Sequence, residues 1–91
     1  MEFFHDKNEI LLYNDNKEVV AYVKFPEVMK GIVNVTTTYV SNELQGQGIA
    51  GKLMNELIEN LKRTNRKAIP TCTYTRNWFS KHSELDYLLV K

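Results

Sequence analysis

The sequence predicts one domain of the α/β (α+β) class over residues 1–91, with a mostly antiparallel sheet followed by a helix, a strand and a second helix. Three observations support this. Apolar residues alternate with more polar ones at residues 19–25, as in a strand that buries one face. From Gly48 onward, apolar residues recur at steps of one, three and four, as along one side of a helix. A chain of 91 residues leaves no room for a second domain.

The strands are predicted in the first half of the chain. Residues 10–25 contain two apolar runs around Asn14-Asp15-Asn16, and these residue types favour tight turns, so a β-hairpin is expected. Phe25-Pro26 and Lys30-Gly31 are expected to bracket a connection. Residues 32–40 are rich in β-branched side chains and predict one further antiparallel strand. Its alternation places four side chains on one face: Val33, Val35, Thr37 and Tyr39.

The helices are predicted in the second half. A helix should begin after Gly48 and fade near residues 64–65, because its apolar residues form a single stripe. The stripe consists of Ile49, Ala50, Leu53, Met54, Leu57, Ile58 and Leu61. Residues 67–72 predict a short strand, residues 75–82 a smaller helix, and residues 85–91 a final strand.

The composition excludes several classes of protein. A net charge of +1 argues against a generic nucleic-acid binder. Cys72 is the single cysteine, so neither an intramolecular disulfide nor a zinc cluster is expected, and no metal is predicted. The N-terminus does not resemble a signal peptide, and no apolar run approaches the roughly 20 residues that span a bilayer. These features predict a cytoplasmic protein without membrane contact.

The segment ELQGQGIAGKLM, residues 43–54, fits three anion-binding patterns. A dinucleotide-binding G-x-G-x-x-G needs a buried parallel strand before it and a carboxylate about 20 residues later, and neither is present. A Walker A loop needs a Ser or Thr after Lys52, where this chain has Leu53. The third pattern is Q-x-x-G-x-A, formed by Gln45, Gly48 and Ala50. A bland alternative is that the glycines only permit a tight turn.

The third pattern suits an anion at the start of a helix. Gly46 and Gly48 have no Cβ, so a bulky anion can approach the main chain. The first N–H groups of the helix lack partners, and the helix dipole is positive at this end. A pyrophosphate there would accept several charge-assisted hydrogen bonds. The turn would begin at Gln45, and Ala50 is small enough to allow a close approach.

Residues 45–50, Gln-Gly-Gln-Gly-Ile-Ala, match the R/Q-x-x-G-x-G/A motif of the GNAT superfamily of acetyl-CoA-dependent N-acetyltransferases. Residues 36–84 resemble its compact YjdJ-like branch, which follows the loop with a Pro-x-Cys, an aromatic residue, a Trp and a His. These positions are Pro70, Cys72, Tyr74, Trp78 and His82. The branch often has a His in the strand before the loop, whereas this chain has three threonines, so a role for that His is not carried over.

The resemblance implies a minimal GNAT fold in which residues 32–40 and 68–72 form a parallel pair that splays apart. It implies that the glycine loop holds the pyrophosphate of acetyl-CoA (coenzyme A) and that the pantetheine arm enters the splay. The residues implied in binding are Val40, Leu44, Gln45, Gly46, Gln47, Gly48, Ile49, Ala50, Gly51 and Asn77.

The resemblance implies a catalytic role for Cys72, as a nucleophile that accepts the acyl group or as an acid that protonates the leaving thiolate. The alternative is a small packed side chain, since free cysteines are often inert. Tyr74 and His82 are candidate acid and base, or packing residues. Lys52, Arg76 and Lys81 are either contacts of the 3′-phosphate or solvated charges.

The expected function is transfer of acetyl from acetyl-CoA to an unknown amine, directly or through the Cys72 thiol. The alternative is a non-catalytic acetyl-CoA-binding sensor or interaction module, which the shortness of the chain favours. The partners expected are acetyl-CoA and an amine or thiol acceptor, without nucleic acid or membrane. The chain is expected to be a monomer or a weak homodimer.

Overall fold

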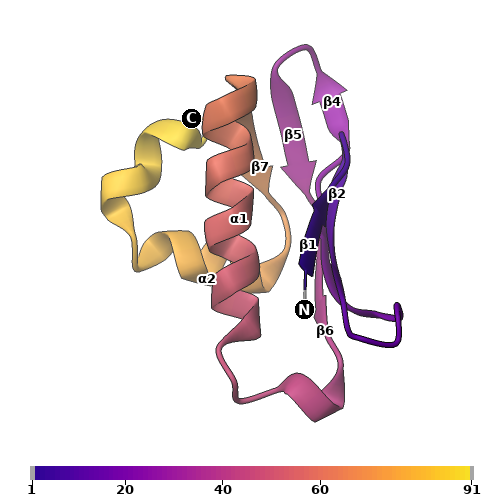
Figure 1. Cartoon of the computed structure of the whole chain (residues 1–91). Helices are drawn as coiled ribbons and strands as arrows, with labels where there is room; N and C mark the ends of the chain where they lie inside the picture. The colour runs from indigo at the N-terminus through magenta and orange to yellow at the C-terminus, as the bar shows by residue number, and fades with distance from the viewer. Residues whose placement is uncertain (1, 91) are drawn as a thin grey trace.

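The computed structural model describes residues 2–90 and has the predicted α+β class. Two small sheets lie on one side, and the helices pack together on the other side (Figure 1). The four-stranded sheet has the order β1 (Glu2–His5), β2 (Glu9–Tyr13), β3 (Val19–Lys24), β6 (Thr37–Val40). The three-stranded sheet has the order β4 (Glu27–Met29), β5 (Ile32–Val35), β7 (Lys67–Pro70). The helices are α1 (Ile49–Thr64) and α2 (Thr73–Ser80), with 3₁₀ turns η1 (Asn42–Leu44) and η2 (Ser83–Leu88).

The predicted hairpin is confirmed as β2 and β3, which pair antiparallel. Its turn is organised by the side chain of Asn14, whose Oδ1 accepts hydrogen bonds from the N–H groups of Asn16 at 2.9 Å and Glu18 at 3.0 Å. Lys17 adopts a positive φ of 63° within this turn. An asparagine that bonds the main chain two residues ahead is a common way to start a turn, which is why the local sequence predicted it.

The single strand predicted at residues 32–40 is wrong, because the chain divides it into β5 and β6. Thr36 lies between them, and its N–H donates to the Lys24 carbonyl at 3.0 Å. This residue shifts the alternation of side chains by one position. Val33 and Val35 are buried in β5, whereas Thr37 and Tyr39 of β6 are exposed. The prediction that these four side chains share one face is therefore also wrong.

Three other element predictions need correction. Residues 27–29, expected in a connection, form β4, which pairs with β5 and thereby satisfies its main-chain groups. The tail forms η2 rather than a strand, and only Leu89 makes a parallel bridge, to Ala68. The strand predicted at residues 67–72 ends at Pro70, and α2 begins at Thr73 rather than at residue 75. Residue 91, part of the predicted final strand, lies outside the described residues.

Helix α1 has the bounds that the sequence predicted. Gly48 is its N-cap with a φ of 75°, and Asn65 is its C-cap with a φ of 56°. Both are in the left-handed region that glycine and asparagine tolerate best. The buried stripe of the helix packs against the inner face of the four-stranded sheet. The fully buried members of this core include Leu53, Met54, Leu57, Leu61, Ile10 and Val23.

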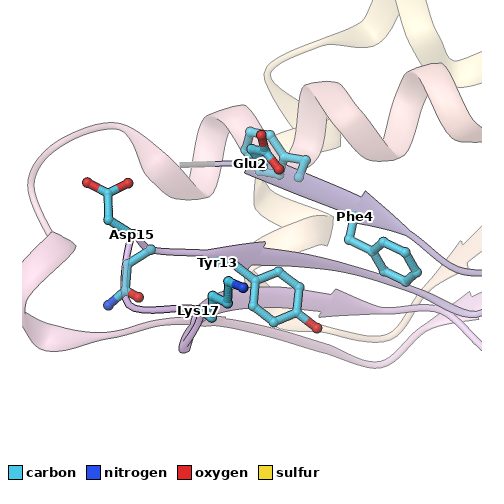
Figure 2. Close-up of a pocket in the computed structure, with 7 residues that line it drawn as sticks. Glu2, Phe4, Tyr13, Asp15 and Lys17 are labelled. Carbon is cyan, nitrogen blue, oxygen red and sulfur yellow. The ribbon is translucent and has the colours of Figure 1, made fainter.

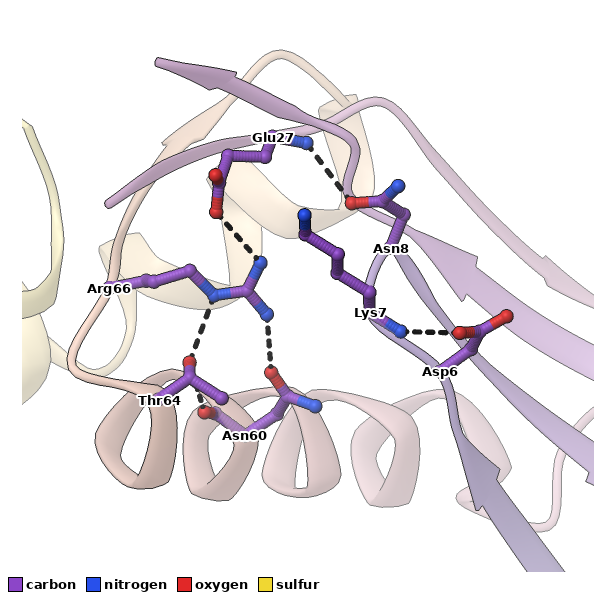
Figure 3. Close-up of polar contacts among 7 residues, drawn as sticks. All are labelled: Asp6, Lys7, Asn8, Glu27, Asn60, Thr64 and Arg66. Carbon is purple, nitrogen blue, oxygen red and sulfur yellow. Dashed lines mark hydrogen bonds and ion pairs between the residues drawn. The ribbon is translucent and has the colours of Figure 1, made fainter. Parts of the chain in front are cut away.

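A polar cluster fastens the C-terminal end of α1 to β4 (Figure 3). The Arg66 side chain is 8% exposed and uses all three of its nitrogens. Nε donates to Thr64 Oγ1 at 2.9 Å, Nη2 to Asn60 Oδ1 at 2.9 Å, and Nη1 to Glu27 Oε1 at 3.3 Å. A guanidinium that is buried and paired in this way holds its partners in one geometry.

The same cluster reaches β1 through His5. The side-chain amide of Asn60 donates to His5 Nδ1 at 3.1 Å, because its oxygen already accepts from Arg66. His5 Nε2 therefore carries the proton and donates to Glu56 Oε1 at 2.7 Å. The sequence assigned no role to His5, since its partners lie more than 50 positions away. None of the helices within residues 2–90 is long and apolar enough to cross a bilayer.

The Arg66 cluster gives a prediction about stability. Replacing Arg66 with Met should lower the free energy of unfolding by about 2–4 kcal/mol, because Glu27 and Asn60 lose their buried donor. Urea denaturation measures the change. Lys62→Met, on the exposed face of the same helix, is the control and should stay within about 0.5 kcal/mol of the parent. Equal losses in both variants would contradict the role of the cluster.

Candidate active site

The two parallel strands separate at one carbonyl group. β5 and β7 pair in parallel from Ile32 with Lys67 to Val35 with Pro70. Beyond that point, the Val35 carbonyl accepts hydrogen bonds from the N–H groups of both Thr71, at 3.1 Å, and Cys72, at 2.9 Å. β6 then pairs with β3 on one side, and no strand formed by residues 2–90 pairs with its other side. An unpaired edge of this kind presents free N–H and C=O groups to a ligand.

The glycine loop lies beside this edge and requires glycine at two positions. Gly46 has a φ of 84° and Gly48 a φ of 75°, values that strain other residues. A Cβ built at either position would meet no atom within 4 Å, so the constraint comes from the main chain and not from packing. The Gln45 side chain braces the loop, because its Nε2 donates to the Val40 carbonyl at 3.2 Å and to Asn42 Oδ1 at 3.3 Å.

The start of α1 presents main-chain donors without partners. The first helical bond runs from the Lys52 N–H to the Gly48 carbonyl, at 3.1 Å. Among residues 2–90, none accepts a hydrogen bond from the N–H groups of Gly48, Ile49, Ala50 or Gly51, and no side chain caps the helix. No acidic residue lies in the first turn of α1. This end of the helix can therefore hold an anion through its free donors and its positive dipole.

A hollow of about 170 Å³ joins the loop, the helix start and the edge of β6. Most of the predicted binding residues line it, namely Val40, Leu44, Gln45, Gly46, Gly48, Ile49, Ala50 and Gly51. Two predicted residues do not: Gln47 is exposed and donates from Nε2 to the Glu43 carbonyl, and Asn77 is exposed on α2. Tyr74 also lines the hollow, and the sequence did not include it among the binding residues.

Cys72 occupies the N-cap of α2 at the mouth of the splay, not a position within a strand. Its Sγ lies 3.6 Å from Thr38 Oγ1, and Thr38 in turn lies 3.4 Å from the hydroxyl of the fully buried Thr75. Burial alone would raise the pKa of the thiol. Hydrogen bonds from the Thr75 N–H, the Thr38 and Thr75 hydroxyls and the Tyr74 N–H outweigh it, so the pKa of Cys72 lies below its ordinary value.

The pKa of Tyr74, two residues later, is shifted in the opposite direction. Burial raises the pKa of its phenol, because the ionised form would lose hydration. At neutral pH the phenol therefore keeps its proton. The side chain is still 39% exposed, so a ligand in the hollow can reach it.

His82 does not line the hollow. Its ring stacks on Trp78 with centroids 3.8 Å apart and planes inclined by 15°. Its Nδ1 lies 2.7 Å from the Trp78 carbonyl and donates to it. These contacts fit the packing role that the sequence allowed. Within residues 2–90, no group of His, Cys, Asp and Glu side chains is arranged to hold a metal ion.

The comparisons with known proteins identify a family. The model of the GCN5-related N-acetyl-transferase family matches residues 9–88. A GCN5-like protein from Staphylococcus aureus, solved by NMR, is 25% identical with a TM-score of 0.78, covering 98% of this chain and 87% of that one. No curated protein matches the chain. The assignment to the YjdJ-like branch stays a prediction.

Two larger solved structures share the fold. A GNAT family N-acetyltransferase from Escherichia coli in complex with CoA is 22% identical with a TM-score of 0.64, covering 75% of this chain and 43% of that one. A GNAT family acetyltransferase from Elizabethkingia anophelis with acetyl-CoA bound is 15% identical with a TM-score of 0.64, covering 82% and 51%. The chain thus spans about half the length of these two proteins.

The Cys72 environment predicts a pH dependence. Because the pKa of Cys72 is lowered, the fraction of thiolate at a given pH exceeds that of an ordinary cysteine, and alkylation by iodoacetamide should reach half its maximal rate at a lower pH than for glutathione. Thr38→Val removes one hydrogen bond to the sulfur and should move this midpoint upward. Thr37→Val is the control, because the Thr37 hydroxyl donates a hydrogen bond to Thr36 and, within residues 2–90, forms none with Cys72. A midpoint that is equal in all three proteins would contradict the assignment.

Proposed function

The chain belongs to the GCN5-related N-acetyltransferase family, and on this premise we propose that it binds acetyl-CoA and transfers the acetyl group to an amine. One observation carries the proposal. The glycine loop opens onto four main-chain N–H groups at the start of α1 that no residue in 2–90 occupies. That arrangement fits a pyrophosphate, because each charge-assisted hydrogen bond contributes about 1.5–3 kcal/mol.

Different residues around the hollow would hold different parts of acetyl-CoA. Gly46, Gly48 and the N–H groups that follow would hold the pyrophosphate. The free edge of β6 and the apolar side chains of Val40 and Leu44 would hold the pantetheine arm, as an added strand is held. Gln47 and Asn77 stay predicted contacts outside the hollow. The cytoplasmic location also stays a prediction of the composition.

Bound acetyl-CoA would supply an acetyl group activated as a thioester. Cys72 is poised to be the nucleophile, since its lowered pKa favours the thiolate. Tyr74 lines the hollow and keeps its proton, and in this proposal it would donate that proton to the departing thiolate. In this route, the acetyl group passes to Cys72 and then to the amine. In the alternative, the amine attacks the thioester directly and Cys72 or Tyr74 acts only as an acid.

A second candidate function is acetyl-CoA binding without turnover, as a sensor or interaction module. The observation that favours it is the absence, among described residues that line the hollow or contact Cys72, of a carboxylate or histidine that would deprotonate an amine. Binding and turnover must therefore be measured separately.

The first test concerns binding. Gly48→Val should weaken the binding of CoA, measured by titration calorimetry, by at least about tenfold, because a side chain would enter the anion site and the positive φ would be strained. Gly31→Val is a matched control, since Gly31 has a similar φ of 78° in the turn between β4 and β5. It should lose stability but keep its affinity. Unchanged affinity in Gly48→Val would refute the loop assignment.

The second test concerns Cys72. Incubation with acetyl-CoA should add the mass of one acetyl group, which mass spectrometry of the intact protein detects and which Cys72→Ala abolishes. An amine acceptor added afterwards should remove the adduct. Acetylated amine without any adduct would contradict the Cys72 route and leave direct transfer. Binding of acetyl-CoA with neither an adduct nor an acetylated amine would support the second candidate function, a sensor or interaction module.

A further inference from the structure

The four-stranded sheet has one face that no other element of residues 2–90 covers. Both helices lie on the opposite side of the sheet (Figure 1). Helix α1 packs on the side of Ile10, Leu12 and Val23, which are buried. The alternate residues of the same strands point the other way. We call this surface the open face; its members include Glu2, Phe4, Glu9, Leu11, Tyr13, Tyr22, Lys24, Thr37 and Tyr39.

The open face carries a row of apolar side chains that are in register across the strands. The strand registers place Phe4 opposite Leu11, Leu11 opposite Tyr22, and Tyr22 opposite Tyr39, so one apolar row crosses all four strands. Phe4 is 53% exposed and Tyr39 is 45% exposed. The rings of Tyr22 and Tyr39 stack with centroids 5.2 Å apart. A contiguous apolar surface of this kind on a sheet commonly marks an interaction site.

A recess adjoins the row at the hairpin end. A hollow of about 560 Å³ is lined by Glu2, Phe3 and Phe4 of β1, Tyr13 of β2 and the turn residues Asn14, Asp15 and Lys17. Figure 2 shows the rings of Phe4 and Tyr13 on the side of the strands away from α1. The hollow contains none of the predicted acetyl-CoA-binding residues. The open face and the acetyl-CoA site are therefore separate surfaces.

The charges of the open face indicate what covers it. In the neighbouring row, Glu9 of β2 pairs in register with Lys24 of β3, and these are the two central strands of the sheet. A two-fold axis parallel to the strands, between β2 and β3, would place Glu9 of one copy over Lys24 of the other, and the reverse. The same axis would place Phe4 over Tyr39 and Leu11 over Tyr22. The pattern is self-complementary, as an isologous interface requires.

We propose that the open face is the interface of a two-fold homodimer in which two four-stranded sheets pack face to face. Four strands spaced about 4.8 Å apart, with five residues of about 3.3 Å each, give a face of roughly 19 by 16 Å. This is smaller than the approximately 800 Å² per partner that stable complexes bury, so the dimer is weak. A net charge of +1 opposes the association of two copies very little.

Sedimentation equilibrium of the full chain from about 10 µM to about 1 mM tests the proposal, with an expected dissociation constant on the order of 100 µM. Phe4→Glu should raise that constant by at least about tenfold, because a carboxylate would face Tyr39 of the other copy. Tyr87→Glu is the matched control, since Tyr87 is 57% exposed on η2 and should not affect association. A monomer mass at every concentration would overturn the proposal.

Charge reversal tests the orientation of the axis. Glu9→Lys and Lys24→Glu should each weaken the dimer, because like charges would then face each other across the interface. The double variant should restore association to the level of the parent protein. Thermal unfolding of each variant separates association from folding. Failure of the double variant to recover, with its stability intact, would overturn the proposed packing, and so would equal weakening by Tyr87→Glu.

Discussion

The gap between β6 and the chain that follows Pro70, which we call the cleft, depends on one main-chain hydrogen bond at Thr36. Its N–H bonds to Lys24 of β3, so the chain leaves the three-stranded sheet and enters the four-stranded sheet within a single residue. The Val35 carbonyl just before it is the last group shared with the β7 segment. If β6 continued beside the chain that follows Pro70, main-chain bonds would close the gap that the hollow now occupies. The switch of sheets therefore creates both the free edge and the position of Cys72.

Local signals predicted the elements whose ends are fixed locally. Asn14 organises the hairpin turn through its own side chain, and Gly48 and Asn65 bound α1 because both adopt the left-handed conformation. The switch at Thr36 was not predictable in this way, since seven of the nine residues 32–40 are β-branched and its partner Lys24 is 12 positions away. The apolar tail was read as a strand, but β7 is only four residues long and bonds it at a single bridge.

The same distinction between local and distant determinants applies to the candidate site. The glycine loop and the start of α1 are contiguous in sequence, so their position side by side was predictable from the sequence, while their role in binding stays a proposal. The hydroxyl groups that contact Cys72 were not predictable, because Thr38 reaches it from β6 and Thr75 from the first turn of α2. Helix α2 begins two residues earlier than predicted, which puts Tyr74 in its first turn beside the loop and Asn77 in its exposed second turn.

The alternation of side chains along β6 separates the two proposed binding surfaces, the acetyl-CoA site and the dimer interface. Thr38 and Val40 point toward α1 and the cleft, where they meet Cys72 and the hollow, whereas Tyr39 points to the open face. Two copies joined through Tyr39 would leave the hollow accessible in each. Beside the hollow, burial of Cys72 is outweighed by hydrogen bonds from the first turn of α2 and from Thr38, which lower the pKa of its thiol, whereas burial raises the pKa of Tyr74, which lines the hollow. Two titratable groups whose pKa values are shifted in opposite directions commonly act as nucleophile and acid. Here the main-chain donors of α2 stabilise the thiolate of Cys72, whereas Tyr74 is affected by burial alone.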